Sequence, residues 1–301
     1  MSDPSLQQKK YPRLTGKDCK LKACHEIHIF VGPIHAPKES DSDRENFLLV
    51  RQKYEKCVAN WNETRLSTLI LRDKDLVTHT EMKKPILTLI FRDGKGEQPV
   101  TVCQSARHIF CDDQHKVIQL AQEDAEFFKQ AGFDVLRIKI EAMAYGIDGI
   151  PQTIDEALKF SDCYFEFHIL VQHVEVGDDA RPQLITPKEE AELRRISNVV
   201  SKNLHVPVPL SFNTTKNETN IKNGGCQRFL NVCFRGLGIC DIEPKLAQCC
   251  DEINQSGLQF RVQKKISEYV WFDTLNSMDR CWIDYSPQEA AEMQARLSME
   301  Q

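Results

Sequence analysis

Two Glu-x-His pairs are the residues of this sequence whose types and spacing could do chemistry. Residues 24–31 read Cys-His-Glu-Ile-His-Ile-Phe-Val, and residues 163–171 read Cys-Tyr-Phe-Glu-Phe-His-Ile-Leu-Val. Glu26 and His28 therefore recur as Glu166 and His168, 140 positions later. Both runs have the alternation of a half-buried strand, on which residues two apart point to the same side. Each pair is predicted to lie on one face of a strand.

A histidine beside a carboxylate is held in one tautomer and has a tunable charge, which suits acid–base chemistry or ligand binding. Two further predicted strands carry charged residues that could join the pairs: Arg137, Lys139 and Glu141 in the first half of the chain, and Lys264 and Glu268 in the second. A ligand site would use Glu26, Glu166, Arg137, Lys139 and Lys264, where the basic groups favour a small anionic ligand. An enzyme would use His28, His168, Glu141 and Glu268 as its catalytic residues.

Two other interpretations stay open. The same residues could form cross-strand ion pairs that only stabilise the fold, at roughly 0.2–1 kcal/mol each. Alternatively, the chain could be a phosphoester- or nucleotide-directed enzyme, because 2H phosphoesterases also have two halves with one strand histidine each. That family has His-x-Thr or His-x-Ser, whereas this chain has His28-Ile29-Phe30 and His168-Ile169-Leu170. The hydroxyl that would help to hold a phosphate is absent from both.

No metal site or cofactor is predicted. His25 and His28 are three residues apart and would face opposite sides of a strand, so they make a poor metal pair. Gly94-Lys95-Gly96 lacks the spacing of a phosphate-binding loop. The basic residues near the N-terminus are few and the formal net charge is −5, so a nucleic-acid partner is not expected. The partner is either a small anionic ligand or another protein.

The composition is that of an ordinary globular protein: of 301 residues, 41% are hydrophobic and 28% are charged. No apolar run approaches the roughly 20 residues that a membrane span needs, so no membrane association is expected. The first ten residues lack the apolar segment of a secretion signal. The protein is therefore expected in the cytoplasm, with its 12 cysteines reduced.

The order of predicted elements divides the chain into two similar parts. Residues 1–22 are expected to form a loose arm, 23–150 a first β-α-β-β-α-β unit with an insertion, 151–162 a linker, 163–285 a second such unit, and 286–301 a C-terminal helix. Within the first unit, residues 66–71 are predicted to form a strand because of their apolar content. Asp112 or Asp113 is predicted to cap a helix that ends at Gly132.

The β-α-β-β-α-β order is the ferredoxin-like pattern. We therefore predict an α+β protein that arose by internal duplication of two ferredoxin-like units with mostly antiparallel sheets. In each unit the first strand should be central, flanked by the third and the fourth. Helices should cover one face of the sheet, and the other faces should pack the two halves together.

Three stretches resemble an uncharacterised, largely bacterial protein family. They are Tyr164-Phe165-Glu166-Phe167-His168, Ala131-Gly132-Phe133 with the following Arg137–Glu141, and Glu268–Asp273 with Trp282-Ile283. The resemblance extends over about residues 24–285. It implies two ferredoxin-like halves and no particular activity.

Overall fold

The computed structural model describes most of the chain. The described residues are 15–18, 20–34, 41–74, 76–83, 86–90, 100–160, 162–173, 185–204, 206, 208, 210–211, 227–255 and 260–274. The predicted C-terminal helix at 286–301 and the first 14 residues of the predicted arm lie outside them. Gly16 and Leu21, at the end of that arm, are both buried.

Nine strands of the described chain form one sheet flanked by helices. The strands are β1 (Ala23–Ile34), β2 (Thr78–His79), β3 (Ile86–Ile90), β4 (Val100–Cys111), β5 (Val135–Met143), β6 (Tyr164–His173), β7 (Leu210–Ser211), β8 (Gln227–Phe234) and β9 (Phe260–Asp273). The helices are α1 (Asp41–Thr64), α2 (Leu66–Asp73), α3 (Gln114–Gln130), α4 (Ile154–Ala157), α5 (Pro187–Leu204) and α7 (Ile239–Asn254).

Each half has the strand order of a ferredoxin-like unit. The sheet runs β2-β4-β1-β5-β9-β6-β8-β7, with β3 also paired to β4, and all of these pairings are antiparallel. In both halves the first long strand lies between the third and the fourth core strand, as predicted. The α+β class and the antiparallel sheet are thereby confirmed.

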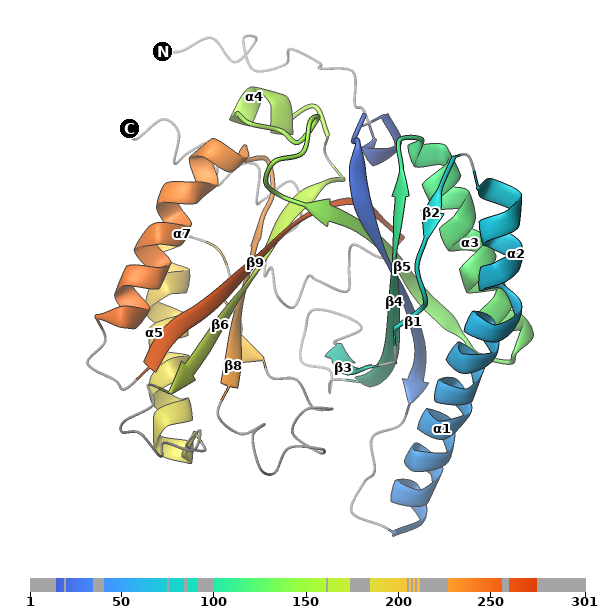
Figure 1. Ribbon diagram of the computed structural model, residues 1–301. Helices are drawn as coiled ribbons and strands as arrows, with labels where there is room; N and C mark the ends of the chain where they lie inside the picture. Colours follow the sequence, from blue (N-terminus) through green and yellow to red (C-terminus); the bar gives the residue numbers. More distant parts are fainter. Residues whose placement is uncertain are drawn as a thin grey trace, which may run out of the picture.

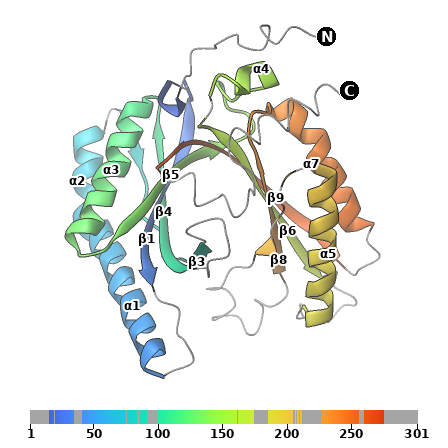
Figure 2. The same ribbon diagram turned by 180° about the vertical axis from the view of Figure 1, so that it is seen from behind.

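The two halves join edge to edge. Their fourth strands, β5 and β9, pair directly, with Ile140 opposite Phe272 and Glu141 opposite Val270. The expectation that the halves pack through their sheet faces is therefore wrong, because strand pairing makes the sheet continuous. The sheet curves, so that the uncovered faces of the halves turn toward each other (Figures 1 and 2).

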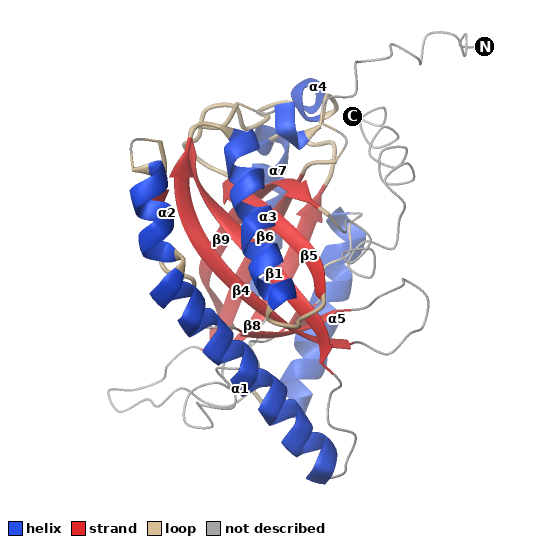
Figure 3. Cartoon of the chain, turned by 90° about the vertical axis from the view of Figure 1, so that its right-hand side faces the viewer, coloured by secondary structure: helices blue, strands red, loops and turns tan. Residues whose placement is uncertain are grey.

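Helices cover the outer side of the curved sheet. Figure 3 shows α3 lying along β1, β4 and β5, and α7 contacts β9 in the other half. Residues of β1 at odd positions, such as Ile27 and Ile29, belong to the same buried core as Val117 and Leu120 of α3. Residues at even positions of β1 therefore point to the other side, which we call the inner face.

Helix ends follow the signals in the sequence. The side chain of Asp113 accepts hydrogen bonds from the backbone N–H groups of His115 and Lys116, which caps α3 as predicted. Gly132 follows that helix with a φ of +83°, a conformation that glycine adopts without strain. The cap fixes where α3 begins beneath β1.

The strand predicted at residues 66–71 is wrong, because this segment is helix α2. A short apolar run does not distinguish a buried strand from a helix by its pattern alone. Here Leu69 is buried and its neighbours Ile70 and Leu71 are exposed, which is the burial of a helix with one covered side. In the described chain no helix has both the length and the apolar character to cross a membrane.

Candidate functional site

The charged residues singled out in the sequence follow four adjacent strands of the inner face, β1, β5, β9 and β6. Glu26 lies opposite Glu141, and His28 lies opposite Lys139. In the second half Glu166 lies opposite Glu268. We call the following residues the seam cluster, because they extend across the join of the two halves: Glu26, His28, Lys139, Glu141, Glu166, His168 and Glu268.

Lys139 connects the halves at the centre of the seam cluster. Its Nζ lies 2.7 Å from Oε2 of Glu141 and 2.9 Å from Oε2 of Glu166. On the far side of Glu141, Oε1 lies 2.5 Å from Nε2 of His28. One ammonium group thus bonds a carboxylate of the first half and a carboxylate of the second half. Lys139 and Glu166 are 27 residues apart in the sequence.

His168 lies beside two carboxylates in the second half. Its Nε2 is 3.5 Å from Oε1 of Glu166 and 3.3 Å from Oε2 of Glu268. Its Nδ1 is 2.5 Å from the amide oxygen of Asn231 on β8. An amide oxygen only accepts hydrogen bonds, so Nδ1 must carry a proton.

In the first half, the hydrogen bond at Nδ1 of His28 has the opposite direction. The amide nitrogen of Gln104 on β4 donates a hydrogen bond to its Nδ1. Nδ1 must then be unprotonated, so Nε2 carries the proton and donates it to Oε1 of Glu141. The two histidines therefore have similar neighbours, but Nδ1 donates a hydrogen bond in His168 and accepts one in His28.

The seam cluster is buried at its centre and partly exposed at both ends. Glu141, Lys139 and Glu166 expose 2%, 6% and 6% of their surface. The side chain of Glu26 exposes 20% at one end, and those of His168 and Glu268 expose 23% and 14% at the other. We call the end at His168 and Glu268 the open end, because Lys83 and His108 already bond Glu26.

Electrostatics keeps the buried centre ionised. Burial alone would raise the pKa of Glu141, but the neighbouring His28 and Lys139 outweigh it and hold that pKa well below its usual range. Burial would likewise lower the pKa of Lys139, but the carboxylates of Glu141 and Glu166 hold it well above its usual range. The lysine and this glutamate therefore form a charged pair.

At the open end the balance is different. Burial would lower the pKa of His168, but its hydrogen bond to Glu268 and the charge of Glu166 raise it to about 9. Burial raises the pKa of Glu268, and the charge of Glu141 raises it further. At neutral pH His168 is therefore protonated, and Glu268 keeps its proton to a higher pH than an isolated glutamate does.

Arg137, predicted to bind a ligand, forms an ion pair with Asp273 within the protein. Its guanidinium bonds both carboxylate oxygens of Asp273, with 2.9 Å between Nε and Oδ1. The same guanidinium donates to the hydroxyl of Tyr164 at 3.0 Å. Arg137 is 4% exposed, so this group is buried next to the seam cluster.

Lys264 lies apart from the other predicted site residues. It pairs with Leu170 on β6, two positions beyond His168, and it is exposed. Glu26 lies at the opposite edge of the cluster, where Lys83 bonds it at 2.7 Å and His108 lies 3.2 Å away. The structure thus brings together seven of the nine predicted residues, with Arg137 adjacent and Lys264 separate.

Sequence reasoning missed Gln104, Asn231 and Asp273. Gln104 and Asn231 orient the two histidines, and each lies on the third core strand of its half. Asn231 pairs directly with His168 across the strands. The predicted strand order already placed the third core strand of each half beside the strand with the histidine. Pairing the residues of these two strands in register could therefore have found both Gln104 and Asn231.

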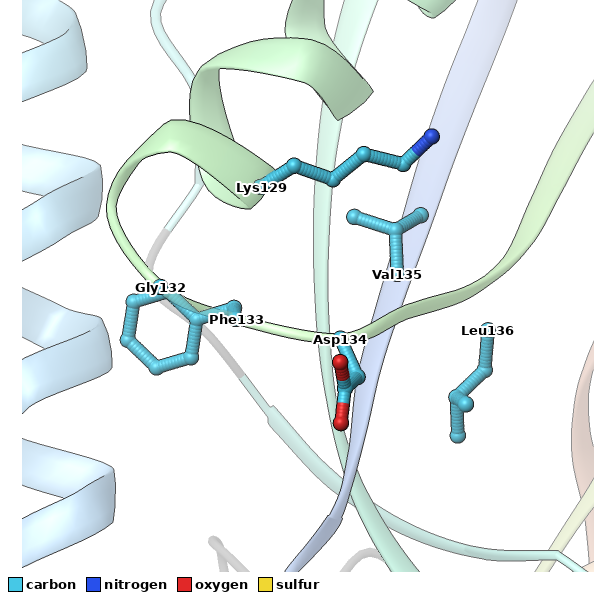
Figure 4. Close-up of a pocket in the computed structure, with 6 residues that line it drawn as sticks. All are labelled: Lys129, Gly132, Phe133, Asp134, Val135 and Leu136. Atoms are coloured by element: carbon cyan, nitrogen blue, oxygen red, sulfur yellow. The ribbon is translucent and has the colours of Figure 1, made fainter.

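Two cavities lie elsewhere. The first has about 560 Å³ and is lined by Lys129, Gly132, Phe133, Asp134, Val135 and Leu136, at the end of α3 and the start of β5 (Figure 4). The second has about 350 Å³ and is lined by Met143, Tyr145, Glu243, Leu246, Lys265 and Ser267. Neither cavity includes a residue of the seam cluster.

Two groups in the cluster have the donor atoms of a metal site: Glu26, His28 and Glu141, and Glu166, His168 and Glu268. In each, the three residues offer ligand atoms within 4.8 Å of one another. His25 belongs to neither. It lies on the outer face, where its Nε2 donates to the carbonyl of Cys111 and its Nδ1 accepts from the indole of Trp271.

Comparisons with known proteins do not identify the family. No family model matches the chain, and no curated protein matches it either. The resemblance to an uncharacterised family therefore stays a prediction.

Some solved structures are weakly similar over most of the chain. A heme-binding protein from Thermus thermophilus is 9% identical, with 93% of this chain and 98% of that one covered and a TM-score of 0.25. A mutant chlorite dismutase from Candidatus Nitrospira defluvii is 7% identical, with 92% and 97% covered and a TM-score of 0.24. A dye-decolorizing peroxidase from Bacteroides thetaiotaomicron VPI-5482 is 10% identical, with 86% and 96% covered and a TM-score of 0.24. Such low scores carry no argument about this protein.

Proposed function

We propose that the protein is a binding module that holds a small ligand on the inner face of its sheet, at the open end of the seam cluster. The observation that carries the proposal is the position of the charges. Charged residues of both halves gather on the face that no described helix covers, and His168 and Glu268 remain accessible at one end.

The energetics support a role beyond stability. Removing an ion from water costs several kcal/mol even after the protein relaxes, and apolar residues of similar volume often stabilise a core as well as a buried ion pair does. Lys139, Glu141 and Glu166 are all buried. A join between two halves needs no such cluster, since the β5–β9 strand pairing already connects them.

Binding is a better interpretation than catalysis. A phosphoester-directed enzyme would need His28 and His168 free in one accessible cleft. His28 is 7% exposed and is bonded on both ring nitrogens, to Glu141 and to Gln104. Only His168 has an accessible side, so the two histidines cannot act as an equivalent pair.

We also infer that the two halves arose by duplication. Both have the same strand order, and the first strand of each carries a Glu-x-His pair on the inner face. Each histidine is oriented by an amide side chain from the third core strand of its half. Nδ1 donates a hydrogen bond in His168 and accepts one in His28, which supports a divergence of the two sites in function.

A thermal-shift screen tests the binding function. Nucleotides, sugar phosphates, short RNA and divalent metal ions are added in turn to the wild type, to a His28→Ala/His168→Ala double variant and to His115→Ala, an exposed control on α3. A ligand of this site raises the melting temperature of the wild type and the control but not of the double variant. The proposal is wrong if no ligand distinguishes the double variant from the control.

A further inference from the structure

The group of Glu166, His168 and Glu268 contains three donor atoms that face one another. Nδ1 of His168 carries a proton because it donates to Asn231, so the lone pair of a neutral ring is on Nε2. That nitrogen faces Oε1 of Glu166 and Oε2 of Glu268. At neutral pH a proton on Nε2 holds the three atoms together, since the pKa of His168 is raised to about 9, and a metal ion binds here by displacing that proton.

The spacing of these atoms is long for charge-assisted hydrogen bonds and matches the spacing of two ligand atoms on one metal ion. Charge-assisted N–H···O bonds are about 2.7–2.9 Å long, whereas the two distances here are 3.5 Å and 3.3 Å. Two donors bound at about 2.0–2.2 Å to one tetrahedral ion lie about 3.4 Å apart. The two separations therefore match the edges of a coordination polyhedron.

Neighbouring residues hydrogen-bond His168 and Glu166 in the way that such residues usually orient metal ligands. A histidine that binds a metal usually donates its other ring N–H to an oxygen acceptor, as His168 does to Asn231. A ligating carboxylate is usually held through its second oxygen, and Oε2 of Glu166 lies 2.9 Å from Nζ of Lys139. Asn231 is 2% exposed and Glu166 is 6% exposed, so neither is a surface residue that happens to lie nearby.

We propose that Glu166, His168 and Glu268 bind one divalent transition-metal ion, with His168 coordinating through Nε2. This inference rests on the proposed function, because it names the ligand class of the same site. One imidazole and two carboxylates suit Zn²⁺, Mn²⁺ or Fe²⁺ rather than the softer ions that thiolates select. Three protein ligands leave a coordination position open on the accessible side.

The group of Glu26, His28 and Glu141 provides an internal comparison. Nε2 of His28 carries a proton and donates it to Glu141, so this nitrogen has no lone pair for a metal. Glu26 is bonded by Lys83. The first group is therefore closed by a 2.5 Å hydrogen bond and suits an ion less well than the second, whose donor atoms are 3.3–3.5 Å apart.

The test is binding of Mn²⁺ to the full-length protein, measured by calorimetry and electron paramagnetic resonance. Mn²⁺ is chosen because it prefers oxygen and imidazole ligands to thiols, and Cys24 and Cys240 are exposed. The variants are His168→Ala, His28→Ala from the first group, and the exposed control His115→Ala on α3. Asn231→Leu and Asn231→Asp form a second pair, in which aspartate keeps the acceptor for Nδ1. Circular dichroism without metal checks that each variant folds.

We expect one Mn²⁺ to bind per chain. The affinity for Mn²⁺ should fall by more than about 100-fold in His168→Ala and by about 10–100-fold in Asn231→Leu. Asn231→Asp should keep much of the wild-type affinity. Equal binding by His168→Ala and the wild type overturns the proposal, as does a loss in His28→Ala that matches the loss in His168→Ala. If Mn²⁺ does not bind but another ligand stabilises the wild type through His168, the metal proposal fails and the binding function stands. If nothing binds through His168, both fail.

Discussion

Lys139 is the single residue on which the charge balance of the seam cluster depends. Its ammonium group bonds the carboxylates of both Glu141 and Glu166, which are buried in different halves of the chain. Removing one partner of a buried ion pair costs far more than the pair contributes, because it leaves an uncompensated charge. The same reasoning does not apply to exposed pairs, which contribute little.

Substituting Lys139→Met is expected to lower the free energy of unfolding by about 3–5 kcal/mol, because two buried carboxylates lose their counter-ion. The control is Lys83→Met, which removes an exposed ammonium group from Glu26 and is expected to cost less than about 1 kcal/mol. Urea denaturation measures both. Similar losses in the two variants would show that Lys139 is not the centre of the cluster.

His25 makes stability depend on pH. Burial lowers its pKa from 6.5 to about 4. As pH falls from 6.5 to 4, His25 takes up a proton in the unfolded chain but stays neutral in the folded protein. The free energy of unfolding therefore falls by about 3 kcal/mol over this range. Above pH 6.5 the residue is neutral in both states and has no such effect.

A His25→Gln variant is therefore expected to lose less stability than the wild type between pH 6.5 and 4, although it starts from a lower value. Chemical denaturation at several pH values gives the two slopes, and exposed His115→Gln is the control. Parallel curves for the wild type and His25→Gln would contradict the assignment of His25 as a buried neutral histidine.

Among the elements, β9 is also contacted by residues 15–18. The backbone of Gly16 lies so close to that of Trp271 on β9 that a Cβ atom on Gly16 would be 1.4 Å from the Trp271 carbonyl oxygen. The N–H of Gly16 also donates to the carboxylate of Asp162. Only glycine fits at this contact.

Gly16→Ala is expected to detach residues 15–22 from the sheet, because the clash is with backbone and cannot be relieved by a side-chain rotation. The expected result is faster hydrogen exchange and proteolysis at this segment. Gly146→Ala is the control: a Cβ there contacts nothing within 4 Å, and its φ of +72° costs about 1–2 kcal/mol without detaching a segment. Unchanged exchange near Leu21 in Gly16→Ala would contradict this contact.

The elements also show what the sequence could and could not predict. The period of two along β1 and β6 sufficed to place Glu26 with His28 and Glu166 with His168 on one face. It did not place Lys264, because its distance from the cluster depends on the long-range pairing of β9 with β6, which sets Lys264 opposite Leu170. The helix at α2 was missed because its run of apolar residues is too short to reveal its period.

At the scale of the whole molecule, one sheet passes through both halves. The buried core extends from Leu21 and Trp61 in the first half to Leu193 and Ile253 in the second without interruption. The strand order within each half followed from the order of predicted elements. The edge-to-edge join did not, because no local pattern specifies which edges of two sheets will meet.

A continuous sheet is expected to unfold as one unit. Leu193→Ala removes a fully buried side chain from α5, which should cost about 2–5 kcal/mol. Hydrogen exchange should then show reduced protection of slow amides in both halves, including those of β1. A loss of protection limited to residues 185–274 would indicate two halves that unfold separately.

The most direct test of the account is the state of the His168 ring, observed by nuclear magnetic resonance of imidazole nitrogens during a titration with Zn²⁺. We predict that Nδ1 of His168 keeps its proton throughout, that the signal of Nε2 shifts as the ion binds, and that both nitrogens of His28 are unchanged. A response of His28 in place of His168, or a proton on Nε2 that Zn²⁺ does not displace, would contradict the central claim that the open end of the seam cluster is a ligand site.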